Sequence, residues 1–403
     1  MVKQVEGGIS APKGVLATGV SCGIKRTGFP DLALVVSEQP GVVAGVFTRN
    51  LVKAAPVLLC QRKIERGGKF SALVANSGNA NACTGSNGMR DANQTAKIAA
   101  KLLNRPAEEV FVASTGVIGE PLPMEKVSLG IAMAVSCVSP HQGGKAARAI
   151  MTTDTFPKEA AVSLMVGGRS VRIGGMAKGS GMIYPRMATM LGFVASDASI
   201  SASLLSRSLS IAINQSFNRI TVDGDTSTND MVLAFANGLS GSPRIQGGSR
   251  EYLAFQEGLN WVTCSLAQMI VRDGEGATKM IRVKVKGAGS EREAEIVAFA
   301  IANSSLVKTA FFGEDCNWGR ILAAIGSSGV KVRPEKIDLF MGPVQIVKNG
   351  VGLGKDKEEQ TQEILREREI DLGVHLHQGK AQAEVLTCDL SFDYVKINAS
   401  YRT

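Results

Sequence analysis

The sequence predicts a mixed α/β protein, a layered sandwich with largely antiparallel sheets, and two observations carry this prediction. Short apolar segments rich in Val, Ile and Phe alternate with longer stretches in which apolar side chains recur at helical spacing. Some apolar segments follow one another across tight glycine turns, which is typical of hairpins rather than of repeated strand-helix-strand units. Helices on the outer faces would bury the remaining apolar surface of the sheets.

The length and composition of the chain predict a large aliphatic core. The chain has 403 residues, of which 44% are hydrophobic and only 5% aromatic. This length exceeds one ordinary domain, so we expect two parts. No linker or low-complexity tract separates the two parts, and they should therefore pack together as one body.

The N-terminal region predicts strands followed by a helix. The segments "LALVVS", "GVVAGVF", "PVLLC" and "SALVANSG" are short, apolar and bounded by turn residues, so each is predicted as a strand. Residues 91–103 carry Ala and Leu at helical spacing, with a proline soon afterwards. We therefore expect a helix over 91–103.

The middle of the chain predicts one strand, two helices and a hairpin. Residues 110–119 form an apolar run that opens into a glycine loop, and helical spacing returns over 124–137 and 142–151. Residues 160–181 contain two alternating runs on either side of Gly167 and Gly168. This pattern predicts a hairpin with its turn at the two glycines.

The C-terminal half predicts two long helices and a second hairpin. Helical spacing covers residues 201–216 and 250–272, and a buried strand is expected at "MVLAFANG". Residues 280–302 are predicted as another hairpin. The mixed charges of residues 355–369 are typical of a solvated helix face.

Charge and cysteine content exclude several classes of protein. The net charge is +9, but the 45 basic residues are scattered rather than gathered in a stripe, which argues against a nucleic-acid partner. The seven cysteines are odd in number and show no CxxC pair, so neither a zinc knuckle nor a disulfide framework is expected. The N-terminus lacks a signal-type apolar core and no segment predicts a membrane span. We expect a cytoplasmic protein.

Three motifs that could bind phosphate or metal fail on inspection. In "GGMAKGSG" Lys178 precedes Gly179, whereas a phosphate-binding loop needs Lys directly after its last glycine. The three histidines, His141, His375 and His377, complete neither a metal set nor a catalytic triad. The segment "VDGDTSTND" lacks the Glu that a calcium loop needs at its twelfth position. Its side chains are expected to cap a turn, and no metal site is predicted.

Thr189 is a lone hydroxyl in the apolar run "RMATMLGF". A threonine at the start of a chain can attack through its hydroxyl while its own α-amine, with a pKa of about 7.7–8.0, takes the proton. An internal Thr189 would first have to free this amine by attacking the carbonyl of Ala188, so that the amide becomes an ester which water cleaves. A packing role in a strand is the alternative.

Long motifs along the chain resemble one enzyme family. The segment "GMAKGSGMIYPRMATML" is similar to the self-cleavage region of the ornithine acetyltransferase family of arginine biosynthesis, of the bifunctional glutamate N-acetyltransferase type. Further similar motifs are "ANSGNANACTG", "ASTGVIGEPLP", "MTTDTFPK", "DGEGATK", "FFGEDCNWGRI" and "INASYRT". The resemblance implies a four-layer α/β/β/α sandwich, which the family shares with self-processing aminopeptidases.

The resemblance also implies a reaction. The precursor would cut itself between Ala188 and Thr189, and the chains 1–188 and 189–403 would stay together in a heterotetramer of two of each. Thr189 would take the acetyl group from N2-acetyl-L-ornithine and pass it to L-glutamate in a ping-pong reaction. No metal and no bound cofactor are implied, and acetyl-CoA as a further acetyl donor is left open.

The family's site residues carry over by motif. Thr115 and Gly116 match the oxyanion-hole pair, a hydroxyl and a backbone N–H. Lys178 matches a cation that holds a substrate carboxylate and disfavours protonation of the new amine. Glu275 matches the anion that faces the substrate's amino groups. Thr152 matches a substrate contact, and Asn398 and the terminal Thr403 match substrate contacts on a C-terminal strand that closes over the site.

Two other readings of the sequence stay open. One is an N-terminal-nucleophile aminopeptidase on the same fold, which would act on peptides and need no acetyl acceptor. The other is a metabolite-binding protein without enzyme activity, whose chain would remain intact. Dependence on glutamate and the mass of the chain separate these from the transferase.

Overall fold

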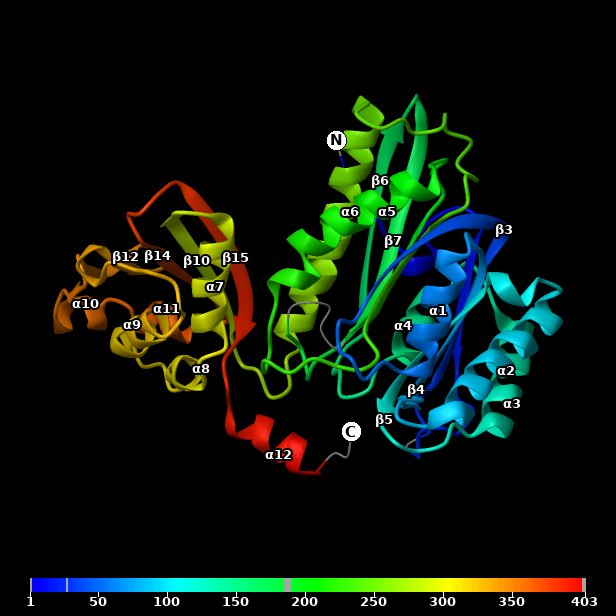
Figure 1. Cartoon of the computed structure of the whole chain (residues 1–403), viewed down its shortest axis with the longest axis horizontal. Coiled ribbons are helices and arrows are strands. Elements are labelled where there is room, and N and C mark those ends of the chain that lie inside the picture. Colours follow the sequence, from blue (N-terminus) through cyan, green and yellow to red (C-terminus); the bar gives the residue numbers. More distant parts are fainter. Residues whose placement is uncertain (1, 27, 185–189, 401–403) are drawn as a thin grey trace.

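The computed structural model describes residues 2–26, 28–184 and 190–400, and it divides into a large main body and a smaller C-terminal lobe (Figure 1). The main body contains nine strands and the lobe contains six. The lobe has a hydrophobic core of its own, which draws its side chains from residues 281–385. The predicted division at 188/189 falls within 185–189, outside the described residues, and stays a prediction.

The strands of the main body form two layers that one long strand joins. β3 (Leu32–Phe47) pairs with β2 (Val15–Val20) and β4 (Lys69–Asn79) along its first half. Its second half pairs with β9 (Met231–Ala236), and the register shifts between the halves. β5 (Val110–Val117) completes the first layer beside β4.

The second layer continues from β9 and includes β7 and β8, the two strands that come before and after residues 185–189 in the sequence. Its order is β9, β8, β7, β6 and β1. These strands span β8 (Leu191–Ser196), β7 (Arg169–Lys178), β6 (Lys158–Val166) and β1 (Lys3–Gln4). Side chains of β8 and β9, such as Phe193 and Leu233, share one buried cluster with residues of β4 and β5. The two layers therefore pack face to face.

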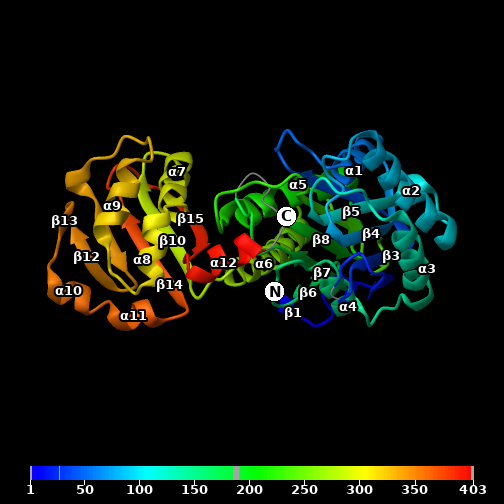
Figure 2. The ribbon, with the colours of Figure 1, turned by 90° about the horizontal axis from the view of Figure 1, so that it is seen from below.

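Helices cover the outer faces of both layers, which confirms the four-layer α/β/β/α sandwich (Figures 1 and 2). The β4 side carries α1 (Ala55–Glu65), α2 (Gly85–Leu103), α3 (Met124–Cys137) and α4 (Gly143–Ala149). The β7 side carries α5 (Ala202–Gln215) and α6 (Arg250–Arg272). Most strand pairs are antiparallel, as expected, and parallel pairing is limited to β4–β5, β8–β9 and β10–β14 among the described strands.

The C-terminal lobe is a sheet with helices on one face. Its strand order is β13-β12-β11-β14-β10-β15. The strands are β10 (Met280–Ala288), β11 (Asp338–Met341), β12 (Val344–Lys348), β13 (Val351–Gly352), β14 (Glu369–His375) and β15 (Ala381–Cys388). The covering helices are α7 (Glu291–Ala302), α8 (Ser305–Phe312) and α9 (Trp318–Gly326). After β15 the chain returns to the main body as α12 (Phe392–Ser400), a helix where the resemblance implied a strand (Figure 2).

The predicted hairpin over residues 280–302 is wrong, because β10 is followed by the helix α7. The Ser290 hydroxyl caps this helix by accepting a hydrogen bond from the N–H of Glu293 at 3.2 Å. Buried Ala294, Val297 and Ile301 lie three and four residues apart, on one helical face. The cap and this spacing outweigh the β-branched residues that suggested a strand.

Two other segments also differ from the prediction. The segment "PVLLC" belongs to α1, where Pro56 occupies the first turn, a position at which proline costs no hydrogen bond. Residues 355–369 do not form one solvated helix: they contain α10 (Lys355–Glu359), α11 (Gln362–Arg366) and the start of β14. The break between the two short helices buries Thr361. The remaining predicted helices are confirmed, although α2 begins at Gly85 instead of residue 91.

The described helices were also compared with the length and hydropathy of a membrane span. None of them alone is long and apolar enough to cross a bilayer, and α7 with α8 would qualify only as a pair bent by 58°.

All seven cysteines, which lie within the described residues, are free thiols, so the structure contains no disulfide bond between them.

Candidate active site

A small, partly open cavity lies where the ends of β5 and β7 meet the turn before β9 and the helix α12. Its volume is about 100 Å³. Six residues predicted from the sequence line it: Thr115, Gly116, Thr152, Lys178, Glu275 and Asn398. These residues come from five separate segments of the chain. Ala188, Thr189 and Thr403 lie outside the described residues, and the roles of all nine stay predictions.

Thr115 and Gly116 end the strand β5 beside β4. The φ angle of Gly116 is +130°, a conformation that L side chains rarely adopt. A Cβ atom at this position would lie 2.4 Å from the carbonyl carbon of Gly78 and 2.6 Å from the nitrogen of Asn79. Position 116 therefore admits no side chain, and the backbone there can approach a ligand closely.

Lys178 is the last residue of β7, and its side chain is almost completely buried. It pairs in register with Leu191, the first residue of β8. β8 thus begins at the wall of the cavity, two residues after the predicted nucleophile. Burial lowers the pKa of the Lys178 ammonium, and the Asp154 carboxylate opposes this effect.

Two aspartates hold the backbone on either side of residues 185–189. The Asp223 carboxylate accepts hydrogen bonds from the N–H groups of Met182, at 2.5 Å, and Ile183, at 2.9 Å. Asp230 Oδ1 accepts from the N–H of Met190 at 3.1 Å. Burial raises the pKa of Asp223 to about 6, and it also raises the pKa of Asp230 well above its ordinary value.

The sequence reasoning missed the role of both aspartates. They belong to "VDGDTSTND", which was expected only to cap a turn. The other carboxylate oxygen of Asp230 is buried and has no hydrogen-bond partner among the described residues. A possible signal was the position of this polar run, directly before the fully buried strand β9. Buried carboxylates at such a place are costly and point to a site.

Glu275 and α12 close another side of the cavity. The N–H of Glu275 donates to the carbonyl of Ser180 at 2.8 Å, and its Oε2 accepts from Asn398 Nδ2 at 2.8 Å. A Cβ at Gly181 would lie 2.4 Å from the Glu275 carboxyl group, so the glutamate packs against bare backbone. The hydroxyl of Tyr394, also on α12, donates to Asp223 Oδ2 at 3.4 Å. α12 therefore contacts two acids of the site.

A buried ion-paired triad lies beneath the cavity. Lys158 Nζ lies 2.6 Å from Asp154 Oδ1 and 2.5 Å from Asp273 Oδ2. Burial alone would raise the pKa of Asp154, but the ammonium groups of Lys178 and Lys158 hold it well below its usual range. The motif "MTTDTFPK" pointed only to Thr152, so the sequence reasoning missed this triad as well.

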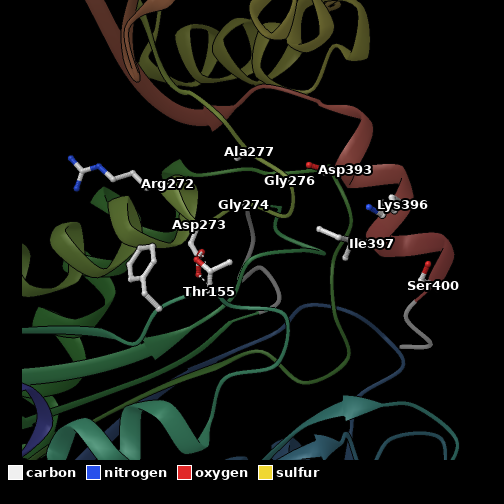
Figure 3. A pocket seen from close by; sticks show the side chains of 11 residues that line it. Thr155, Arg272, Asp273, Gly274, Gly276, Ala277, Asp393, Lys396, Ile397 and Ser400 are labelled. Carbon is white, nitrogen blue, oxygen red and sulfur yellow. Dashed lines mark hydrogen bonds between the residues drawn. The ribbon is translucent and has the colours of Figure 1, made fainter. Parts of the chain in front are cut away.

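A second, larger cavity lies on the other side of the triad. Its volume is about 490 Å³, and Figure 3 shows Lys396, Ile397 and Ser400 of α12 on one side of it. Thr155 and Asp273 lie on the other side. α12 therefore borders both cavities.

The arrangement suits a small molecule that carries charges of both signs. The cavity is lined by the buried ammonium of Lys178, by several carboxylates and by the bare backbone of Gly116. Within the described ranges, no group of three His, Cys, Asp or Glu side chains is placed to hold a metal ion. His375 and His377 lie at the end of β14 in the C-terminal lobe, and His141 is exposed.

Comparison with known proteins gives consistent matches over the whole chain. The ArgJ family model matches residues 16–403. The arginine biosynthesis bifunctional protein ArgJ of Symbiobacterium thermophilum is 54% identical over 404 residues, which cover 100% of both chains. The protein of the same name from Caldanaerobacter subterraneus is 49% identical over 99% of both chains.

One solved structure adds a structural match. The crystal structure of the arginine biosynthesis bifunctional protein ArgJ from Bacillus halodurans shares 45% sequence identity with a TM-score of 0.51. The match covers 53% of this chain and 100% of that chain. Together with the full-length relatives, these matches establish that the chain belongs to the ArgJ family.

Proposed function

We propose that the protein is an acetyltransferase of arginine biosynthesis, which transfers the acetyl group of N2-acetyl-L-ornithine to L-glutamate. Relatives about half identical over their full length are named for arginine biosynthesis. The observation that carries the proposal is the convergence of six predicted site residues on one cavity. Lys178 in the cavity wall pairs with Leu191, the first residue of β8. The predicted nucleophile Thr189 precedes Leu191 by two residues in the sequence.

The proposed chemistry proceeds in two half-reactions. The Thr189 hydroxyl attacks the acetyl carbonyl of acetylornithine while the α-amine of the same residue takes its proton. The oxyanion is stabilised by the Thr115 hydroxyl and the Gly116 N–H, and ornithine leaves as the amine after receiving the proton. The amine of glutamate then attacks the acetyl ester, which releases N-acetylglutamate and restores the hydroxyl.

Charged groups around the cavity would select amino acids. The Lys178 ammonium binds the substrate carboxylate, and the Glu275 carboxylate faces the substrate amine. Asn398 supports this arrangement by donating to Glu275 Oε2 at 2.8 Å. Thr152 supplies a further polar contact, and Thr403, outside the described residues, is a further proposed substrate contact.

The nucleophile requires a cut between Ala188 and Thr189. Residues 189–403 are 215 of the 403 residues, or 53% of the chain. The Bacillus halodurans chain, matched over its full length, covers the same share of this chain, which supports a product of that size. The two products remain associated, two of each, as a heterotetramer in the cytoplasm, and they need no metal or bound cofactor.

A two-substrate assay tests this function. We expect ornithine and N-acetylglutamate in equal amounts, with the parallel double-reciprocal lines of a ping-pong reaction. Acetylornithine alone should release about one ornithine per Thr189 before stopping, because the acetyl group stays on the enzyme. A parallel assay with acetyl-CoA and glutamate asks whether acetyl-CoA also donates.

Two outcomes would reject the proposal. Release of ornithine that does not depend on glutamate, together with peptide cleavage, would favour the aminopeptidase. An uncut chain that binds ornithine without turnover would favour the metabolite-binding protein. The acetyl acceptor separates the first outcome from the transferase, and the mass of the chain separates the second.

A further inference from the structure

One carboxylate beneath the cavity holds two segments that the proposed function uses. Asp154 Oδ2 accepts a hydrogen bond from the N–H of Thr152 at 2.9 Å. Asp154 Oδ1 accepts from the N–H of Gly179 at 2.7 Å, directly after Lys178. The Lys178 ammonium itself lies 4.0 Å from Oδ2. The side chain of Asp154 thus fixes a loop after α4 relative to the end of β7.

Asp154 is in turn fixed by its ion pair with Lys158, whose side chain has no exposed surface. The same ammonium pairs with Asp273, which also accepts a hydrogen bond from the N–H of Thr155 at 3.0 Å. Asp273 belongs to residues 189–403, so the triad would join the two proposed chains beneath the site. Apolar side chains of similar volume are often as stable as a buried ion pair, so the burial of the triad is weak evidence for a purely stabilising role.

We infer that Asp154 is a positioning residue for the acetyl transfer, which sets the distance between Thr152 and Lys178 at which both reach one amino-acid substrate. This inference rests on the proposed function. Asp154 does not line the cavity, whereas Thr152 and Lys178 do. It acts through those residues and touches no substrate.

Asp154 also determines the charge of Lys178. Burial lowers the pKa of Lys178, and Asp154 is the strongest of the groups that oppose this effect. The other charged groups near Lys178 are Lys158, Glu275, Asp230 and Lys25. Removal of the Asp154 charge lowers the pKa of Lys178 further, so Lys178 loses its proton at a lower pH. The substrate carboxylate then loses its cation at that lower pH.

The test compares Asp154→Asn with Asp273→Asn. Both variants remove one carboxylate from Lys158, but Asp273 makes no hydrogen bond to Thr152 or Gly179. The KM and kcat for acetylornithine are measured from about pH 6 to 10, a range that ends near the ordinary lysine pKa, on protein whose cleavage is verified by mass spectrometry. For Asp154→Asn we expect KM to rise about tenfold, with the rise starting at a lower pH than in the wild type. We expect kcat to change less, and Asp273→Asn to keep the wild-type pH profile.

Three results would overturn the inference. The first is a wild-type KM and pH profile in Asp154→Asn, and the second is an equal shift of the profile in both variants. If Asp154→Asn does not fold, the double variant with Lys158→Met, which also removes the buried ammonium and leaves Asp273 its hydrogen bonds from Thr155, is held to the same expectations. The third is a wild-type enzyme that transfers no acetyl group, which would reject the proposed function together with this inference.

Discussion

The strands of the main body and those of the C-terminal lobe use polar residues differently. Every residue of β8 and β9 is buried, because these strands lie between a second strand layer and a helix layer. β10 of the lobe alternates instead: Val283 and Val285 are buried, while Arg282 and Lys284 are partly exposed. Its outer face therefore meets water, because helices cover only the other face of the lobe's mixed sheet.

This difference shows at which positions a charged side chain costs free energy of folding. The lobe's Asp371 pairs with Lys284 at 2.8 Å and with Arg282 at 3.4 Å, and its side chain is 46% exposed. The main-body acids Asp154 and Asp230 are almost fully buried. Exposed pairs contribute little to stability, whereas buried charges need specific partners. The contrast predicts large effects at the cavity and small effects on the lobe.

Substitution of Thr189 should have the largest effect. Thr189→Ala removes both the attacking hydroxyl and the new amine, so we expect one intact chain without transferase activity. Thr189→Ser keeps the hydroxyl and should still be cut, although more slowly, because serine lacks the methyl group that restricts χ1. Mass spectrometry and the acetylornithine assay check both variants. A wild-type chain that stays intact while active would contradict the mechanism.

Substitution of Gly116 should slow both cleavage and transfer. Gly116→Val pushes the backbone away from Gly78 and disturbs an N–H of the proposed oxyanion hole. Loss of one such donor costs about 2.7–4 kcal/mol in transition-state stabilisation. The measurements are the rate of chain cleavage and kcat. Gly119→Ala is a matched control, since Gly119 also has a positive φ, of +86°, but no atom lies near its Cβ position. Normal rates in Gly116→Val would remove position 116 from the hole.

Glu275→Ala should weaken turnover and leave cleavage intact. Glu275 faces the proposed substrate amine rather than the cleaved bond, and loss of a buried charge partner costs about 2 kcal/mol or more. The loss should appear in kcat/KM for acetylornithine, while mass spectrometry shows two chains. Asn398→Ala, which removes the hydrogen bonds to Glu275 Oε2 and to the Tyr394 carbonyl but keeps the Glu275 charge, should have a smaller effect. An uncut Glu275→Ala chain would show that the glutamate acts in cleavage instead.

Local patterns were enough to predict much of the fold. The helices α3 and α6 and the turn at Gly167 follow from apolar spacing and from glycines in sequence order. The sequence failed where a local signal competed with another, as at α7, where β-branched residues concealed a capped helix. The sequence could not predict the separate lobe, because its boundary depends on which sheet and helix faces pack against each other in three dimensions.

The site was predicted less completely, and for a physical reason. Thr115, Gly116, Lys178 and Glu275 were placed through motif resemblance, and the structure brings them to one cavity. Asp223 and Asp230 were missed because their partners are mainly backbone N–H groups of distant segments. Asp154 was missed because the contact that ties it to the site is the N–H of Gly179, 25 residues away. No spacing in the sequence reveals such contacts. Only the fold shows that these carboxylates are buried.

The smallest effect is expected on the lobe, at Asp371. Asp371→Asn removes the ion pairs with Lys284 and Arg282 on the solvated face of β10, and exposed pairs contribute about 0–1 kcal/mol. We therefore expect the free energy of unfolding to fall by no more than about 1 kcal/mol. Urea unfolding in the Thr189→Ala background keeps the chain single, and the acetylornithine assay in the otherwise wild-type protein should give an unchanged kcat/KM. Because salt screens such pairs, the small difference in stability should shrink further at high ionic strength. A tenfold loss of kcat/KM, that is about 1.4 kcal/mol, would mean that this face of the lobe contributes to function.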